Sequence, residues 1–359
     1  MRKNSLSYPV EFTTDVFGKD NDRLAELLRK VTGNEHPRVM LVADLNVVQH
    51  VDGLGTKIGA YIQTNGIELA AAPVVIAGGE KIKCDSLRSA LQVVSSALDA
   101  KIGSNDVMLV IGGGTLFDVA GWAGAQIRGG VKLVRIPTTP AAMIDAAFSD
   151  NAAIDSANIK DALKIPCVPA AVVIDTAFAK TVLDGVWRGG FAAAVRMAVT
   201  TDKSFCRLLS EMASGFRNRE TGALDKLVRA AYESRLKAGA DTFGEWAALR
   251  LESMSSYKLP HGYALALGVL IDSYFANILG ELKDEDLAVI ERMLADSGAK
   301  EGASHSHHLV QQTESLLAGL SAWALTHPEG IVIPTGIGKR KIVEIPDREA
   351  MKSALNMIK

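Results

Sequence analysis

Ile111-Gly112-Gly113-Gly114-Thr115-Leu116-Phe117-Asp118 is the stretch of this 359-residue chain that decides its fold. An apolar, strand-like run (107–110) precedes it, and an apolar, helix-like run (119–122) follows it. Glycines at a strand-to-helix switch let backbone N–H groups approach a phosphate closely, and the helix N-terminus favours negative charge there. The stretch therefore predicts a phosphate-binding turn within an α/β domain.

Short apolar runs with helical stretches between them extend on both sides of this turn. The strand-like runs are Pro37–Asp44, Ala72–Gly78, Asp106–Ile111, Val131–Pro137 and Ala171–Asp175. Asp85–Leu98 is one of the helical stretches, and this alternation is typical of a parallel sheet with crossover helices. Ligands of such sheets bind at the carboxyl ends of the strands, where the glycine turn and the Pro137-Thr138-Thr139 turn both fall.

The pattern changes after about Thr181. Helical periodicity with few β-branched runs is found in Gly189–Met212, Leu224–Lys237, Phe243–Tyr257, Ala264–Leu279 and Thr313–Leu325. We therefore expect an N-terminal Rossmann-like α/β domain with a parallel sheet over residues 1–181 and a C-terminal all-α domain over residues 182–359. The His305-Ser306-His307-His308 cluster lies in a polar stretch and is expected to be a solvated loop.

Composition excludes several classes of protein. The chain is 48% hydrophobic and 22% charged, with a formal net charge of -2, so no basic excess favours nucleic acid or an anionic membrane. The three cysteines, Cys84, Cys167 and Cys206, are scattered, which favours reduced thiols. Neither an apolar signal core nor a membrane-spanning run is found. We expect a cytoplasmic protein.

Further motifs stand around the glycine turn in a fixed order. Gly79-Glu80-Lys81-Ile82-Lys83 precedes it, and the motifs that follow it are Arg128-Gly129, Ile136-Pro137-Thr138-Thr139 and Leu259-Pro260-His261-Gly262. This ordered set resembles the 3-dehydroquinate synthase family, the NAD-dependent sugar-phosphate cyclases. The resemblance runs through Asp145 and Lys160 to Ile333–Gly338, and it therefore covers nearly the whole chain.

The resemblance implies an NAD site in the first half of the chain. Asp44 would lie near the adenosine ribose, Gly113 and Gly114 near the pyrophosphate, and Asp145 and Lys160 at the nicotinamide end. The remaining residues that the resemblance assigns to the cofactor are Glu80, Lys83, Thr115, Asp118, Thr138, Thr139, Phe178 and Thr181. The other interpretation of the charged residues is that they are surface charges and helix caps.

The same resemblance implies the chemistry. Such a cyclase oxidises a substrate hydroxyl with NAD, eliminates phosphate, returns the hydride and closes a ring, with a divalent metal, usually zinc, polarising the reacting oxygen. The catalytic positions carried over to this chain are Asp145, Lys160, Arg196 and Arg128.

This chain departs from the family pattern at its metal and substrate positions. The position of one glutamate ligand is Ala193, one histidine ligand is replaced by Glu245, and a proton-handling histidine by Leu249, whereas His261 is retained. Glu245 and His261 are the candidate zinc ligands, since carboxylate and imidazole both suit zinc. The alternative is a solvated carboxylate and a hydrogen-bonded histidine.

The substrate anchors depart from the pattern as well. A family lysine is replaced by Asn151, and a family asparagine by Asp161. Lost charged hydrogen bonds cost about 1.5–3 kcal/mol each, so we do not expect the usual substrate, 3-deoxy-D-arabino-heptulosonate 7-phosphate.

Three functions follow from this sequence. The first is a divergent NAD-dependent cyclase or lyase acting on a phosphorylated sugar or cyclitol precursor, as a homodimer by family analogy. The second is an NAD-dependent alcohol or polyol-phosphate dehydrogenase. The third is a catalytically silent NAD-binding protein.

Overall fold

Seven parallel strands form the central sheet of the N-terminal half, in the order β1-β9-β6-β5-β2-β3, with β4 also paired to β2. The computed structural model describes residues 6–156, 159–238, 241–301, 306–344 and 346–358. The chain divides into two compact units, residues 6–182 and residues 183–359. We call them the N-terminal and the C-terminal unit and describe each by itself.

The sheet of the N-terminal unit arises from apolar runs. Its strands are β1 (Val10–Phe12), β2 (Arg38–Asp44), β3 (Glu68–Leu69), β4 (Val74–Ile76), β5 (Val107–Gly112), β6 (Lys132–Pro137) and β9 (Ala171–Ile174). All residues of β5 are buried, as expected for a strand of a parallel sheet covered on both faces. The predicted fold class is therefore confirmed, and β1 and β3 are short strands that sequence analysis missed.

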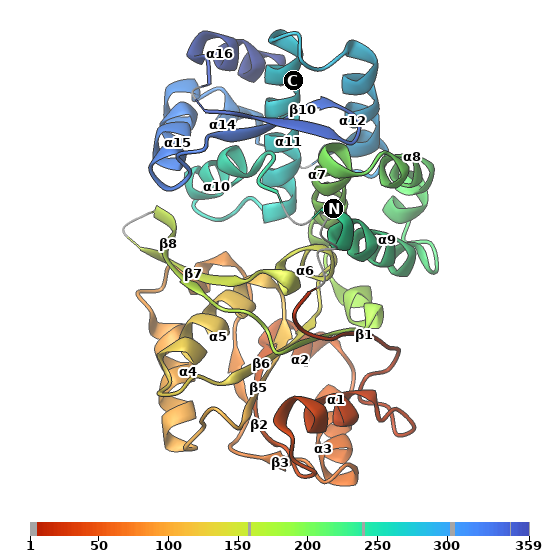
Figure 1. The fold of residues 1–359 in the computed structure, drawn as a ribbon, viewed down its shortest axis with the longest axis vertical. Coiled ribbons are helices and arrows are strands. Elements are labelled where there is room, and N and C mark those ends of the chain that lie inside the picture. The colour runs from red at the N-terminus through yellow and green to blue at the C-terminus, as the bar shows by residue number, and fades with distance from the viewer. Residues whose placement is uncertain (1–5, 157–158, 239–240, 302–305, 345, 359) are drawn as a thin grey trace. The chain divides into compact units, whose positions relative to one another are not determined.

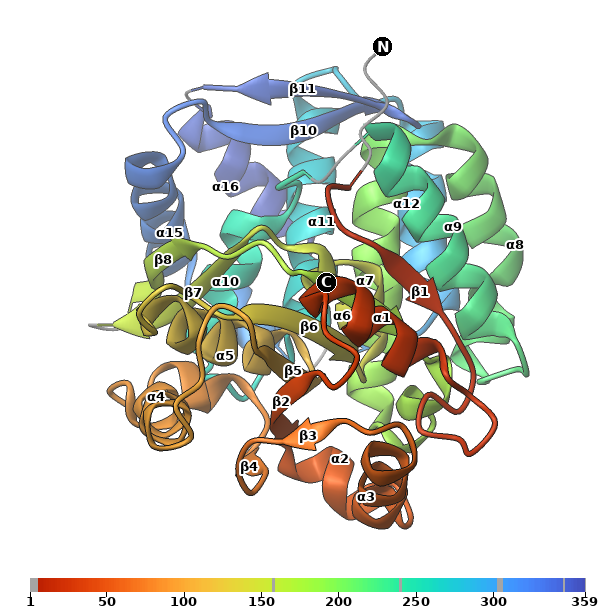
Figure 2. The same cartoon turned by 60° about the horizontal axis from the view of Figure 1, so that its bottom comes forward.

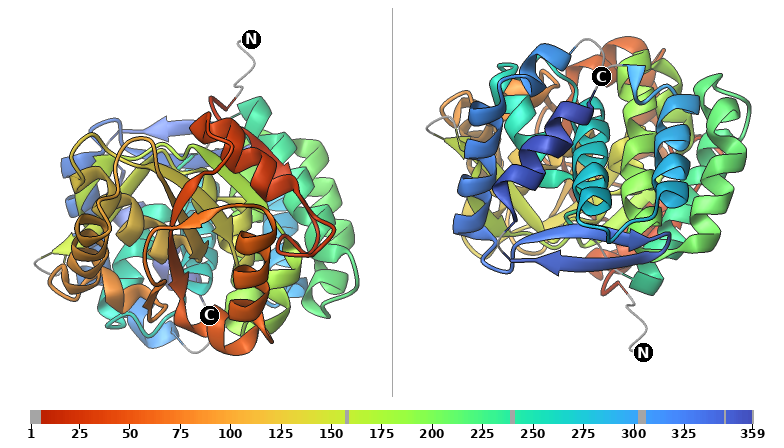
Figure 3. Two further views of the ribbon diagram at one scale, coloured as in Figure 1. Left: turned by 90° about the horizontal axis from the view of Figure 1, so that it is seen from below. Right: turned by 90° about the horizontal axis from the view of Figure 1, so that it is seen from above.

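Helices connect these strands. They are α1 (Arg23–Thr32), α2 (Leu45–His50), α3 (Leu54–Thr64), α4 (Arg88–Asp99), α5 (Gly114–Gln126) and α6 (Pro140–Ile144), with 3-10 helices η1 (Glu80–Lys83), η2 (Ala146–Phe148) and η3 (Thr176–Thr181). Figures 1 and 3 show α4 and α5 together on one side of the sheet and α1 and α3 on the other, and Figure 2 shows β3 and β4 at one margin. Helix α4 begins three residues later than predicted, because Ser86 and Leu87 adopt positive φ angles.

A separate antiparallel hairpin, β7 (Asn151–Ser156) and β8 (Ile159–Pro166), stands between η2 and β9. Sequence analysis did not predict it. Its first strand packs on α5 and on η1, so the hairpin reaches the region of the glycine turn.

The C-terminal unit is mainly helical. Its helices are α7 (Asp184–Thr201), α8 (Lys203–Arg217), α9 (Ala223–Ala238), α10 (Glu245–Met254), α11 (His261–Ile278), α12 (Asp284–Asp296), α14 (His307–Val310), α15 (Thr313–Thr326) and α16 (Arg348–Met357). Helix α11 is buried over most of its length and packs against α7, α10, α12 and α16 (Figure 3, right). An all-round apolar helix of this kind is typical of a domain core.

Three details of this unit differ from the sequence-based expectations. The stretch predicted as one helix, 189–212, is two helices, because Asp202 caps α8 by accepting hydrogen bonds from the N–H groups of Ser204 and Phe205. A hairpin, β10 (Ile331–Gly336) and β11 (Lys339–Val343), accompanies the helices. In the histidine cluster, His307 and His308 lie in α14 instead of a loop, whereas His305 is outside the described residues. Among the described residues, no helix is both long and apolar enough to cross a membrane.

Candidate functional site

The glycine turn joins β5 to α5 at the carboxyl edge of the sheet, as predicted. A Cβ atom on Gly112 would lie 2.7 Å from the Leu116 side chain, and one on Gly114 would lie 2.7 Å from Cβ of Ala146. Both distances are shorter than real Cβ contacts, so a larger residue at either position would require its neighbour to shift. Gly114 is the first residue of α5, a 13-residue helix, so the helix begins without a Cβ atom at its N-terminus, where anions are favoured.

The Pro-Thr-Thr turn lies beside the glycine turn. The N–H of Thr138 donates to the carbonyl oxygen of Gly112 at 3.0 Å, and Thr139 lies 3.4 Å from the Cβ position of Gly113. Thr139 also caps α6, since its hydroxyl accepts from the N–H of Ala142 at 3.3 Å. Two motifs that are 25 residues apart in the sequence therefore meet at one edge, because β5 and β6 are adjacent parallel strands.

Asp44 lies at the same edge, at the end of β2. Its carboxylate accepts from the N–H of Asn46 at 2.8 Å and thereby caps α2. A Cβ atom on Gly78 would lie 2.3 Å from Asp44 Oδ2, so the segment after β4 passes closely over this carboxylate. Burial raises the pKa of Asp44, and the hydrogen bonds from Asn46 oppose that rise. Asp44 thus has a structural task in addition to the predicted ribose contact.

A charged cluster lies between η1, the start of α5 and the β7–β8 hairpin. Its members are Glu80, Lys83, Thr115, Asp118, Asp155, Lys160 and Asp161. Five of these seven residues were predicted as cofactor residues from the resemblance, and the structure brings all five together. We call the seven residues the η1 cluster.

Two lysines organise the η1 cluster. Lys83, whose side chain is only 4% exposed, donates to Asp118 at 2.8 Å and forms a second ion pair with Asp161. Lys160, whose side chain is 7% exposed, pairs with Glu80, which also accepts a hydrogen bond from the Thr115 hydroxyl at 2.6 Å. Both ammonium groups are therefore buried and held by carboxylates.

The electrostatics of the η1 cluster follow from this pairing. Burial alone would raise the pKa of Glu80, but Lys160 and Lys83 outweigh burial and lower that pKa to about 2. Burial would lower the pKa of Lys83, yet the surrounding carboxylates hold it well above its usual value. For Asp118 burial outweighs Lys83 and raises the pKa. The cluster thus contains two lysines paired with carboxylates, and its four acidic residues outnumber them.

Asp155 is the member of this cluster that sequence analysis missed. Its side chain is 1% exposed and lies within 4 Å of both lysine Nζ atoms. The only sequence signal for Asp155 is its place directly after the apolar residues 152–154. This signal indicates a buried site residue only once the hairpin is known.

The other predicted residues of the N-terminal unit lie as follows. Asp145 ends α6 and is half-buried; Phe178 is buried in η3, and Thr181 is exposed at the end of η3. Arg128 is not brought to the η1 cluster. It is exposed in the turn between α5 and β6, at the amino edge of the sheet, because α5 carries the chain about 20 Å from the glycine turn.

The C-terminal unit holds the predicted metal residues, each paired with another side chain. Buried Arg196 on α7 donates to Glu245 Oε2 at 3.2 Å. His261 Nδ1 lies 2.7 Å from Oε1 of Glu252, which is fully buried. Nowhere in the described ranges do three His, Cys, Asp or Glu side chains gather closely enough to hold a metal ion.

A close helix crossing sets the position of His261. A Cβ atom on Gly189 of α7 would lie 2.7 Å from Cα of Gly262, and one on Gly262 would lie 2.0 Å from Cα of Gly189. The glycine that follows His261 is therefore required by packing of α7 on α11, whatever the histidine does.

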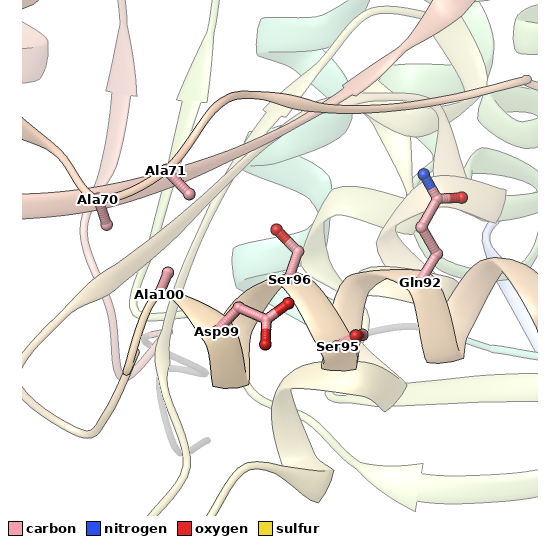
Figure 4. A pocket seen from close by; sticks show the side chains of 7 residues that line it. All are labelled: Ala70, Ala71, Gln92, Ser95, Ser96, Asp99 and Ala100. Atoms are coloured by element: carbon pink, nitrogen blue, oxygen red, sulfur yellow. The ribbon is translucent and has the colours of Figure 1, made fainter.

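One hollow of about 540 Å³ lies on the N-terminal unit, between the end of α4 and the segment after β3. It is lined by Ala70, Ala71, Gln92, Ser95, Ser96, Asp99 and Ala100 (Figure 4). The end of α4 leads into the start of β5, so this hollow lies at the edge of the sheet opposite the glycine turn and outside the candidate site.

Comparison with known proteins identifies the family of this chain. Residues 73–188 match the family described as 3-dehydroquinate synthase N-terminal. A 3-dehydroquinate synthase from Bradyrhizobium diazoefficiens is 30% identical over 312 residues, which cover 81% of this chain and 76% of that protein. Another, from Pyrobaculum islandicum, is 30% identical over 274 residues, or 70% of this chain and 78% of that protein.

Solved structures show the same fold. ValA, a 2-epi-5-epi-valiolone synthase from Streptomyces hygroscopicus with NAD+ and Zn2+ bound, has a TM-score of 0.85 and 22% identity, covering 99% of this chain and 97% of its own. An iron-containing alcohol dehydrogenase from Corynebacterium glutamicum has a TM-score of 0.66 and 14% identity, covering 99% and 96%. Because these identities are below 25%, the solved structures show the fold of this chain and not its function. The curated relatives go further, and they show that the chain belongs to the 3-dehydroquinate synthase family of sugar-phosphate cyclases.

Proposed function

We propose that this protein is an NAD-dependent, phosphate-eliminating cyclase whose substrate is a phosphorylated sugar or cyclitol precursor other than the usual heptulosonate phosphate. The observation that carries the proposal is the η1 cluster, in which Glu80, Lys83, Asp118 and Lys160 meet beside the glycine turn. The replaced substrate anchors, Asn151 and Asp161, argue for a different substrate. We expect a cytoplasmic homodimer.

The residues of the N-terminal unit fit NAD. The turn has no side chains at Gly112–Gly114, the N-terminus of α5 follows it, and the carboxylate of Asp44 lies at the adjacent strand end. NAD, when bound, supplies reversible hydride transfer, so that the reaction has no net redox change.

The lysines of the η1 cluster act by charge in this proposal. Lys160 is ion-paired with Glu80, and Glu80 stays ionised down to about pH 2. An ammonium group held in this way binds and orients an anionic or hydroxyl group instead of accepting a proton. Asp145 stays the candidate for contact with the nicotinamide end.

The C-terminal unit does not present the usual ligand set for zinc. A catalytic zinc commonly has three protein ligands, whereas here Glu245 faces the Arg196 guanidinium and His261 faces Glu252. Zinc binding therefore stays a prediction that rests on Glu245 and His261 alone. Calorimetric titration of zinc into the protein and into His261→Ala tests it: a stoichiometric site lost in the variant would support these ligands, and absence of binding would contradict them.

One assay separates the candidate functions. The protein is incubated with NAD+ and a panel of sugar phosphates, and inorganic phosphate and absorbance at 340 nm are followed together. We expect phosphate release without accumulation of NADH. Accumulated NADH without phosphate would instead support a dehydrogenase, and NAD+ binding with neither signal would support a silent binding protein.

Asp44 offers a matched pair of variants that separates its two tasks. In Asp44→Ser a hydroxyl can still cap α2, whereas Asp44→Ala removes the cap, which costs about 1 kcal/mol of stability. Both variants lose the charged acceptor for the ribose, so we expect NAD+ affinity to fall roughly 10- to 100-fold in both, since such bonds contribute about 1.5–3 kcal/mol. Calorimetry and thermal unfolding measure the two effects. Unchanged affinity in Asp44→Ser would show that Asp44 is a helix cap only.

A further inference from the structure

Two consecutive residues of β8 reach the same neighbouring element. Lys160 pairs with Glu80, at the first residue of η1, and Asp161 pairs with Lys83, at its last residue. In a regular strand, successive side chains point to opposite faces. The backbone of β8 therefore departs from a regular strand at these two residues.

The departure is a bulge in the hairpin. Ser156 is paired with Ile159 and Ile154 with Leu163, so one residue of β7 stands opposite three residues of β8. The φ angle of Asp161 is 55°, in the left-handed region that aspartate tolerates better than most residues other than glycine. Bulges of this kind redirect side chains and are common beside active sites.

Asp155 is the single residue of β7 opposite this bulge. Its Oδ1 atom accepts a hydrogen bond from the N–H of Asp161 at 2.9 Å, which satisfies the donor that the bulge takes out of the strand pairing. The same carboxylate lies 3.9 Å from Nζ of Lys83 and 3.8 Å from Nζ of Lys160. Both of these distances exceed a direct hydrogen bond. Asp155 therefore contacts the bulge backbone directly and the two lysines by charge alone.

We propose that Asp155 is a positioning residue, which fixes the β8 bulge through the N–H of Asp161 and thereby holds Lys160 against Glu80 at the nucleotide site. The nature of the ligand rests on the proposed function, whereas the positioning itself does not. In this proposal, the hydrogen bond from the Asp161 N–H to Asp155 fixes the bulge, and the charge of Asp155 does not.

Pulse labelling of lysines with acetic anhydride, read by mass spectrometry, tests the positioning without any ligand. Lys160 is protected in the folded protein, and exposed Lys164 on the same strand is the internal reference. In Asp155→Ala we expect labelling of Lys160 to accelerate at least tenfold relative to Lys164. In Asp155→Asn the amide oxygen can still accept from Asp161, so Lys160 should stay within threefold of the wild-type rate.

A second pair of variants tests the bulge from its other side. Asp161→Gly and Asp161→Ala lose the same carboxylate, but only glycine tolerates the positive φ angle without strain. We expect Lys160 to stay protected in Asp161→Gly and to become reactive in Asp161→Ala. This pair of variants tests whether the bulge holds Lys160 in place even if Asp155→Ala does not fold.

Several results would overturn the proposal. They are unchanged protection of Lys160 in a folded Asp155→Ala, equal exposure in Asp155→Asn and Asp155→Ala, or equal behaviour of the two Asp161 variants. With NAD+ we expect affinity to fall at least tenfold in Asp155→Ala and less than threefold in Asp155→Asn. If the wild-type protein bound no NAD+, the proposed function would fail, while the labelling experiment would still decide the role of Asp155.

Discussion

In Lys83→Met we expect the free energy of unfolding of the N-terminal unit to fall by about 3–5 kcal/mol at pH 7. The substitution keeps the length of the side chain but leaves Asp118 and Asp161 without the cation that both contact, and Asp155 without one of its two neighbouring ammonium groups. Removing one partner of a buried ion pair costs more than the pair contributes, because the remaining charges are desolvated and repel one another.

The measurement must report on the N-terminal unit alone, since a chain of two units does not unfold in one step. Oxidation of methionines by hydrogen peroxide across a urea series does this, because Met40, Met108 and Met143 are fully buried in that unit. Lys81→Met is the matched control: Lys81 lies in the same 3-10 helix but is exposed, and its loss should cost less than 0.5 kcal/mol.

Acid should partly rescue Lys83→Met. Protonation of the carboxylates removes their repulsion, so the deficit relative to wild type should shrink between pH 7 and pH 4. A deficit below 1 kcal/mol at pH 7, or one that does not change with pH, would show that the carboxylates turn to solvent and that the η1 cluster is not a buried network.

The parts of this site that could be predicted from sequence are those set by local pattern. Apolar runs predict β2 and β5, the glycines predict the turn at Gly112–Gly114, and the geometry of parallel sheets brings strand ends to one edge. Thr138 and Asp44 therefore lie beside the turn as expected, although 94 residues separate them in the sequence.

The parts that could not be predicted depend on contacts between elements. The hairpin that carries Lys160 has a mostly exposed second strand without clean alternation, so no period marks it as a strand. The role of Asp155 requires the bulge, which arises from the pairing of two strands and not from either one alone. Arg128 belongs to the ordered set of motifs but lies at the far end of α5, because the order of motifs in a sequence does not fix the distances between them in the fold.

In the C-terminal unit, too, contacts between elements could not be predicted from the sequence. Helical periodicity predicts α10 and α11, but the pairing of Glu245 with Arg196 joins two helices that are far apart in sequence. A candidate ligand set carried over from family motifs therefore omits the Arg196 guanidinium group that lies beside Glu245.

In Glu80→Gln we expect a loss of stability that depends on pH in a defined window. The pKa of Glu80 is about 2 in the folded protein against 4.5 for an ordinary glutamate, because Lys160 and Lys83 outweigh its burial. Ionised Glu80 therefore stabilises the fold above pH 4.5 by about 3 kcal/mol, and this contribution is lost as the pH falls toward 2.

Glutamine keeps the size of the side chain but removes its charge. The difference in unfolding free energy between wild type and Glu80→Gln should therefore be largest above pH 5 and should decrease by about 2 kcal/mol between pH 5 and pH 3. Methionine oxidation across urea series at these pH values measures this difference. The other carboxylates titrate in both proteins, so their contributions cancel when the two are compared. Glu26→Gln, at an exposed position on α1, should show no such change. A difference that stays constant from pH 5 to pH 3 would mean that the pair with Lys160 contributes through packing and not through charge.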